Sequence, residues 1–207
     1  QLEVIQMQKP NGYDETRAAG EFTPVALGGH YCTIKQVTET QSSTGKNMIV
    51  VLLDFGKPDE QEGYFTNQFN NDDRPDKKWP FAGTKYILVN DHQDPNKTSR
   101  QFKTFCTCIE KSNNHTITWG GSDWGKQFRN LQIGVIYGQE ENEYDGKRFM
   151  RNVPKYLCRI DAVADAKIPE PKYLSGTSIP AAPSTAKPDV NGFLSVDDGL
   201  DDEEIPF

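Results

Sequence analysis

One helix pattern, with strand patterns on both sides of it, most restricts the folds that this chain can adopt. Residues 98–101 have the spacing of a capping box, with a hydroxyl at the cap and a glutamine three residues later. Apolar residues then recur on one helix face at Phe102, Phe105, Cys106 and Ile109. We therefore expect a single amphipathic helix that begins near residue 98 and ends near residue 113.

Three strands are expected before this helix. Residues 30–39 and 48–55 flank a polar turn at 41–46, and this arrangement predicts a β-hairpin. The second of these strands is apolar at nearly every position, so we expect it to be buried on both faces. A third strand is expected at about residues 62–69. A short apolar piece at 86–89 does not indicate which type of element it forms.

Two further strands are expected after the helix. Apolar and polar residues alternate from residue 131, and Asp145-Gly146 is a typical dipeptide of a tight hairpin turn. The chain is expected to return along residues 147–151, and a last strand is expected at 156–163.

The order of three strands, one helix and two strands is that of the OB-fold, a five-stranded β-barrel. We expect residues 1–168 to form a mainly β, OB-fold domain with its helix between strands three and four. A different small β-barrel that carries one helix is the structural alternative.

The composition changes after residue 168, where proline, alanine, serine and threonine become frequent. Residues 169–198 are too poor in apolar side chains to form a core, which predicts a flexible, Pro-rich linker. Residues 171–207 contain two lysines and seven acidic residues, so they carry −5 of the net charge of −7 and leave −2 on the rest. A nearly neutral body can still present a basic groove.

Residues 199–207 are expected to form a disordered, acidic, partner-binding tip. Unpaired carboxylates are costly to bury, whereas an apolar pocket with a basic rim on another protein would accept both the acids and the apolar side chains after them. An ordinary solvated acidic tail is the alternative. The candidate partner-binding residues are Asp201, Asp202, Glu203, Glu204, Ile205, Pro206 and Phe207.

This ending closely resembles the C-terminal tip of bacterial and phage single-stranded DNA-binding proteins, which typically ends in several aspartates followed by Ile-Pro-Phe. The upstream chain is not a close match and looks like a diverged member of the phage or mobile-element type. The resemblance implies that the tip recruits replication, recombination and repair enzymes in the cytoplasm of a bacterium or a phage-infected bacterial host. Family members often assemble into dimers or tetramers, so a homo-oligomer is one expectation.

Aromatic side chains in the body alternate with lysines and arginines, which is typical of surfaces that stack bases and hold the phosphates of single strands. Stacking accepts any base, so little sequence preference is expected. Tyr137 and Phe149 fit a hydrophobic core as well as they fit a base-stacking surface. The candidate residues for single-stranded DNA binding are Tyr64, Lys77, Lys78, Trp79, Phe81, Tyr137, Tyr144, Lys147, Arg148, Phe149 and Arg151.

A glycine-rich loop at residues 119–125 contains two tryptophans. Such a loop can hold a base or close one end of a barrel. We expect it to close the barrel.

Other functional classes have little support in the sequence. The four cysteines are scattered, which argues for reduced thiols in a reducing compartment, and Cys106-x-Cys108 lacks the spacing of a zinc knuckle. The sequence has no phosphate-binding glycine loop with a lysine and no acidic cluster with a convincing catalytic partner. The longest apolar run, residues 49–53, is too short to span a bilayer. We therefore expect no cofactor, metal site, membrane association or enzymatic activity.

The function expected from these observations is that of a single-stranded DNA-binding protein. It would coat and protect single strands and recruit other enzymes through its tip. The alternative is a phage replication or recombination adaptor that mainly binds proteins and has weak DNA affinity. A metal-dependent nuclease is a third class with less support.

Overall fold

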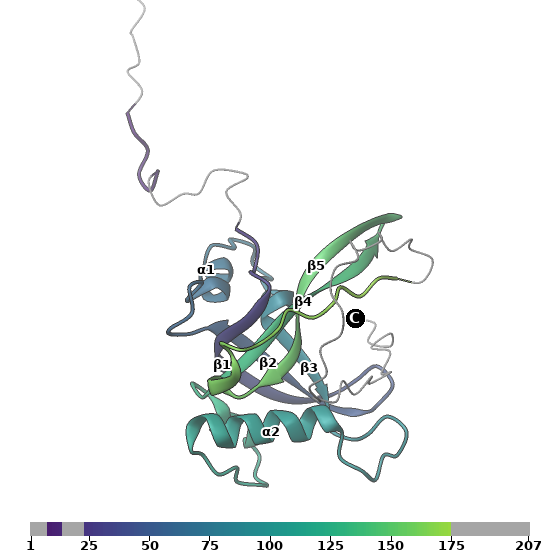
Figure 1. The fold of residues 1–207 in the computed structure, drawn as a ribbon. Coiled ribbons are helices and arrows are strands. Elements are labelled where there is room, and N and C mark those ends of the chain that lie inside the picture. The colour runs from purple at the N-terminus through teal and green to yellow at the C-terminus, as the bar shows by residue number, and fades with distance from the viewer. Residues whose placement is uncertain (1–7, 14–22, 175–207) are drawn as a thin grey trace, which may run out of the picture.

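The computed structural model describes residues 8–13 and 23–174, and their fold is mainly β (Figure 1). Antiparallel strands form a five-stranded open sheet in the order β3-β2-β1-β4-β5. The strands are β1 (Gly28–Gln41), β2 (Asn47–Phe55), β3 (Thr84–Leu88), β4 (Gln132–Tyr144) and β5 (Lys147–Cys158). The helices are α1 (Tyr64–Asn70) and α2 (Arg100–Asn113), with short 3₁₀ helices η1 (Phe81–Gly83), η2 (Trp124–Phe128) and η3 (Ile160–Ala162). The expected tip at 199–207 and most of the expected linker lie outside the described residues.

The first predicted hairpin is confirmed. β1 and β2 pair antiparallel, and the backbone amide of Ser42 donates to the carbonyl of Lys46 (2.8 Å) in the polar turn between them. Burial alternates along β2: one face is buried at Ile49, Val51 and Leu53, and the other is half-buried at Val50 and Leu52. The predicted burial is therefore confirmed for one face of β2, while the other face is only partly buried.

The strand expected at 62–69 is wrong, because most of this segment forms helix α1. Phe65 and Phe69 lie four residues apart, a spacing that fits one face of a helix as well as one face of a strand. Asp54 at the end of β2 accepts hydrogen bonds from the backbone amide of Phe65 (2.9 Å) and from the hydroxyl of Thr66. This distant carboxylate satisfies donors in the first turn of α1. The third strand is β3, which contains most of the short apolar piece that the sequence left open.

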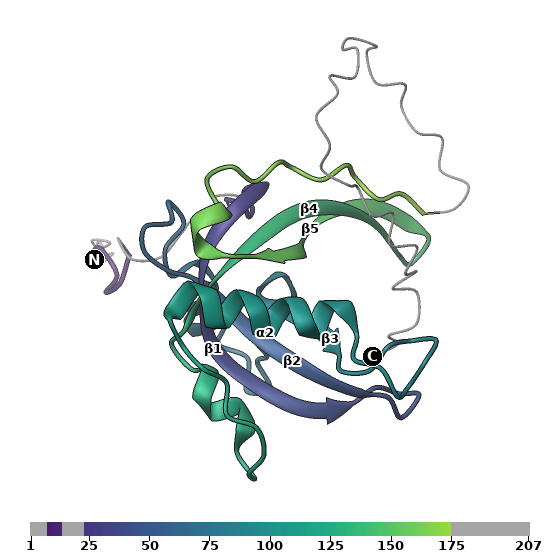
Figure 2. The same cartoon turned by 60° about the horizontal axis from the view of Figure 1, so that its bottom comes forward.

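Helix α2 confirms the predicted amphipathic helix between the third and fourth strands. Its cap is Ser99 rather than Thr98, and the Ser99 hydroxyl accepts the backbone amide of Phe102 (3.1 Å). Asn114 ends the helix in the left-handed conformation, at φ 48°. Figure 2 shows α2 lying across the strands. Its apolar side chains, among them Phe102, Phe105 and Ile109, are buried in the core.

The second predicted hairpin is also confirmed, with one difference. Asp145 and Gly146 have φ values of 51° and 69°, as a tight turn of this kind requires. The segment expected at 147–151 and the first part of the strand expected at 156–163 belong to one strand, β5, which ends at Cys158. The rest of the expected last strand is wrong, because residues 160–162 form η3. Because β5 lies at the edge of the sheet, Pro154 is tolerated within it, and the register with β4 shifts beside it.

The cysteines are free thiols, as expected. Cys32, Cys106 and Cys108 are buried and Cys158 is half-buried. Burial raises the pKa of the Cys106 and Cys158 thiols to about 11. They therefore act as small apolar residues of the core.

The two edge strands of the sheet approach each other. The Lys85 ammonium on β3 donates to the carbonyl of Lys155 on β5 (3.2 Å). The hydroxyl of Tyr137 on β4 donates to the carbonyl of Ala82 in η1 (2.7 Å), which leads into β3. These contacts indicate that the sheet curls around its core.

Candidate nucleic-acid interface

The β4–β5 hairpin projects beyond the rest of the sheet (Figure 1). β4 pairs with β1 only from Gln132 to Tyr137, and we call the two-stranded remainder, residues 138–153, the arm. Directly paired residues lie on the same face of an antiparallel pair, and Tyr144 pairs with Lys147, Asn142 with Phe149 and Glu140 with Arg151. We call the face formed by these residues the ring face: Glu140, Asn142, Tyr144, Lys147, Phe149 and Arg151.

Arg151 lies between two aromatic rings at the base of the arm. Its guanidinium carbon is 4.7 Å from the centre of the Phe81 ring and 5.5 Å from the centre of the Phe149 ring, and both distances allow cation–π attraction. Phe81 is 40% exposed and Phe149 is 41% exposed, so both rings retain accessible surface. The cluster combines two flat apolar surfaces with one cation, drawn from β5 and from the segment before β3.

The tip of the arm continues this pattern. Tyr144 is 78% exposed beside the Asp145-Gly146 turn, and Lys147 is exposed directly opposite it. The sequence correctly indicated an exposed aromatic ring next to a cation at this tip.

Arg148 lies on the opposite face of the arm. Its guanidinium contacts the carboxylates of Glu143 (3.0 Å) and Glu141 (4.0 Å), and Met150 is exposed on the same face. The structure therefore separates Arg148 from the other cations with which the sequence had grouped it, and two acidic neighbours partly neutralise its charge.

Trp79, unlike its neighbour Phe81, has a supporting role and does not offer an open ring. Trp79 is half-buried, and its indole nitrogen donates to the carbonyls of Leu53 (3.1 Å) and Gly83 (3.2 Å). These bonds hold η1, and with it Phe81, against the end of β2. The neighbouring Lys78 is exposed, whereas the Lys77 ammonium lies 4.8 Å from the centre of the ring of Phe69.

Tyr64 also has a packing role. Its ring lies 6.0 Å from that of Phe55, and its hydroxyl donates to the carbonyl of Thr23 (2.8 Å). The ring is only partly exposed, so it offers less surface to a base than Tyr144 does.

The assignment of Tyr137 to base stacking is corrected. Its ring is fully buried against Phe55 and Phe65, and burial raises the pKa of its hydroxyl well above the ordinary value. Its neutral hydroxyl donates to Ala82. The ring is therefore part of the core, which was the alternative that the sequence left open.

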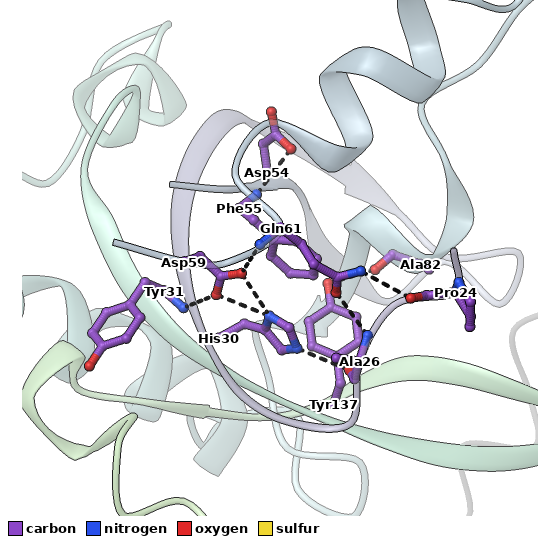
Figure 3. Close-up of polar contacts among 10 residues, drawn as sticks. All are labelled: Pro24, Ala26, His30, Tyr31, Asp54, Phe55, Asp59, Gln61, Ala82 and Tyr137. Atoms are coloured by element: carbon purple, nitrogen blue, oxygen red, sulfur yellow. Dashed lines mark hydrogen bonds and ion pairs between the residues drawn. The ribbon is translucent and has the colours of Figure 1, made fainter. Parts of the chain in front are cut away.

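A polar network around His30, Asp59 and Gln61 holds the segment before β1 (Figure 3). His30 contacts the Asp59 carboxylate through Nδ1 (3.0 Å) and the Ala26 carbonyl through Nε2 (3.0 Å), so both ring nitrogens have a polar partner. The Gln61 side chain donates to the Pro24 carbonyl (3.0 Å) and accepts from the Ala26 amide (2.8 Å). This network fixes the segment that leads into β1.

The same segment contacts the arm directly. The side-chain amide of Asn152, next to Arg151, donates to the carbonyl of Val25 (2.7 Å). The sequence gave no signal for His30 and Asp59 as partners, since they come from β1 and from the loop after β2.

Burial by itself raises the pKa of the Asp59 carboxyl. Hydrogen bonds from His30 and from the backbone amides of Gln61 (2.9 Å) and Tyr31 (3.0 Å) outweigh this effect, so the pKa of Asp59 lies below its ordinary value. The carboxylate is therefore held in its charged form inside the network.

The tryptophan loop divides into a buried and an exposed ring. Trp124 is buried and packs on Phe128 of η2 (4.6 Å between ring centres), so its ring is part of the core. Trp119 stacks on Trp124, with 5.6 Å between ring centres, and is 65% exposed. The expectation that the loop closes a barrel end stays a prediction. It lies close to Phe102 of α2 rather than on the arm.

No family model matches this chain, and no curated protein matches it. Within residues 8–13 and 23–174, no helix combines the length and the apolar character needed to cross a membrane. The same residues contain no group of three or more histidine, cysteine, aspartate or glutamate side chains that could hold a metal ion.

Proposed function

We propose that the described residues form an OB-fold barrel. Three observations support this assignment: the antiparallel strand order β3-β2-β1-β4-β5, the position of α2 between β3 and β4, and the approach of the edge strands through Lys85 and Lys155. OB-folds typically bind oligonucleotides near the loop between their fourth and fifth strands, which in this chain is the tip of the arm.

We propose that the ring face binds single-stranded DNA. The observation that carries this proposal is the half-exposed pair of rings, Phe81 and Phe149, with the Arg151 guanidinium between them. Rings stack on bases and cations hold phosphates, the two tools of single-strand binding, and Tyr144 and Lys147 repeat this combination at the tip. Stacking accepts every base, so binding shows little sequence preference.

In this proposal the protein coats and protects single strands and acts as a non-catalytic partner of other enzymes. The acidic tip, Asp201–Phe207 by sequence, recruits replication, recombination and repair enzymes, as its resemblance to single-stranded DNA-binding proteins implies. A short flexible linker between the domain and the tip raises the concentration of a docked enzyme near the DNA to about the millimolar range. The setting is a bacterium or its phage.

The direct test is a titration of a fluorescently labelled oligo-dT strand with the full chain. We expect tight binding that weakens with salt, and a loss of about 1–3 kcal/mol on truncating either Phe81 or Phe149 to alanine, which corresponds to about 5- to 150-fold in Kd. Trp119→Ala is the matched control, since it removes an exposed ring that lies away from the arm. Absence of binding by the full chain, with docking of other proteins retained, would favour the adaptor alternative.

A further inference from the structure

A short segment after β5 runs back along the free edge of β4 in the arm (Figure 2). The backbone amide of Lys172 donates to the Gln139 carbonyl (2.9 Å), and the amide of Glu141 donates to the Lys172 carbonyl (2.8 Å). The amide of Leu174 donates to the Glu141 carboxylate (3.0 Å). We call residues 168–174 the strap.

Glycines in β1 and β4 allow the chain around the start of the strap to approach the sheet closely. A Cβ atom on Gly29 would lie 2.9 Å from the Cβ of Ala166, and one on Gly138 would lie 2.8 Å from Lys155 of β5 and 3.3 Å from Pro169. These are closer than ordinary side-chain contacts, so β1 and β4 have glycines where this segment passes. The contact is therefore a packed one along its length and not a single crossing.

The strap pairs with the arm where the arm has lost its other partner. β4 leaves β1 after Tyr137, and a two-stranded hairpin alone is only marginally stable in water. The strap adds a parallel bridge between Lys172 and Glu140, and Glu140 pairs directly with Arg151 on β5. Lys172 in the strap, Glu140 on β4 and Arg151 on β5 therefore lie side by side. Arg151 supplies the guanidinium that contacts Phe81 and Phe149.

We propose that the strap is a positioning element, which holds the ring face in the conformation that binds a single strand. This inference rests on the proposed function of the ring face. It assigns the positioning role to the backbone of Lys172 and not to its side chain. In this proposal the strap does not contact the bound DNA. It acts by raising the fraction of molecules in which Phe149 and Arg151 are aligned with Phe81.

The size of the effect follows from this fraction. Apparent affinity is reduced in proportion to the population of the binding-competent state. If loss of the strap leaves the arm aligned about one fifth of the time, Kd rises about fivefold. The number of phosphate contacts stays the same, so the dependence of Kd on salt does not change.

The test compares two substitutions at one exposed position in the full chain. Lys172→Pro removes the amide that donates to Gln139, because proline has no backbone N–H, whereas Lys172→Ala removes only the side chain. Binding of labelled oligo-dT is measured at several salt concentrations, with the melting temperature as a check on folding and hydrogen exchange of the Glu141 amide as a direct report on the strap. Leu174→Pro, which removes the other donated amide, replaces Lys172→Pro if that variant does not fold.

We expect Lys172→Pro to weaken binding about fivefold with an unchanged salt slope, to speed exchange at Glu141, and to melt close to the parent chain, while Lys172→Ala behaves as the parent. Equal affinities of the two variants overturn the positioning role. A similar loss in both, with a smaller salt slope, overturns it too, because the side chain would then be the contact. Failure of the parent chain to bind the strand overturns the proposed function instead.

Discussion

The guanidinium carbon of Arg151 lies 4.7 Å from the centre of the Phe81 ring, and this contact joins the arm to the segment that leads into β3. Phe149 places a second ring 5.5 Å from the same carbon. A guanidinium group and a nucleic-acid base are both flat and both stack on aromatic rings. We therefore expect a base to enter between the rings and the displaced guanidinium to meet a phosphate.

Substitution of Arg151 tests this exchange. Arg151→Ala should weaken binding of oligo-dT and lower the slope of log Kd against log salt by about 0.7, because one phosphate contact is lost. Arg151→Lys should retain the slope but still bind more weakly, since an ammonium group does not stack as a flat guanidinium does. Equal affinity and slope in all three chains would contradict a phosphate role for this residue.

The two cations at the arm tip should differ. Lys147→Gln should lower the salt slope by about 0.7, because Lys147 lies on the ring face opposite Tyr144. Arg148→Gln should leave it unchanged, because Arg148 lies on the other face against Glu143. The same titration series measures both, and an effect at Arg148 equal to that at Lys147 would show that the strand does not follow the ring face.

Tyr137 should matter for stability and not for stacking. Tyr137→Phe leaves the carbonyl of Ala82 without the donor that it has at 2.7 Å, and loss of a hydrogen bond of this kind costs about 0.5–1.5 kcal/mol. We expect this loss in urea unfolding, with affinity for oligo-dT within about twofold of the parent chain. A large loss of affinity with unchanged stability would restore the role that the sequence suggested.

The pair of His30 and Asp59 should make stability depend on pH. The pKa of Asp59 is lowered in the folded protein, so its stabilising contribution is complete above the unfolded value of about 4 and is lost as pH falls through the folded value. Asp59→Asn should cost about 1–3 kcal/mol at neutral pH, because it replaces the charged acceptor of His30 and of the Tyr31 and Gln61 amides with a neutral amide, and should flatten the acid side of the stability curve. Urea unfolding at several pH values measures both effects, and parallel curves for parent and variant would exclude the carboxylate as their source.

Local patterns in the sequence were enough to find much of the fold. α2 and both hairpins followed from spacing and turn residues, since these signals lie within a few residues of each other. α1 was mistaken for a strand because its first turn depends on Asp54, a residue from a different element. The sequence does not identify β3 as a strand, because five residues are too few to show a clear alternation of apolar and polar side chains.

The candidate site was predicted only in part. Exposed rings beside cations at the tip were recognisable from the dipeptide turn that follows Tyr144. The sequence could not show that Phe81 meets Arg151, that Arg148 faces away from it, or that Tyr137 is interior, because each depends on strand register and curl. The sequence predicts a linker for most of the strap, because its proline-rich composition is typical of one. Its pairing with β4 is made by backbone atoms of Lys172, which leave no pattern in the sequence.

The most direct test of the central proposal is photo-crosslinking of the full chain to an oligo-dT strand that contains 5-iodouracil, followed by mass spectrometry. If the ring face binds the strand, crosslinks should concentrate on Phe81, Tyr144 and Phe149. Crosslinks confined to Trp119, or equal yields from the parent chain and a chain with Phe81 and Phe149 both changed to alanine, would contradict it.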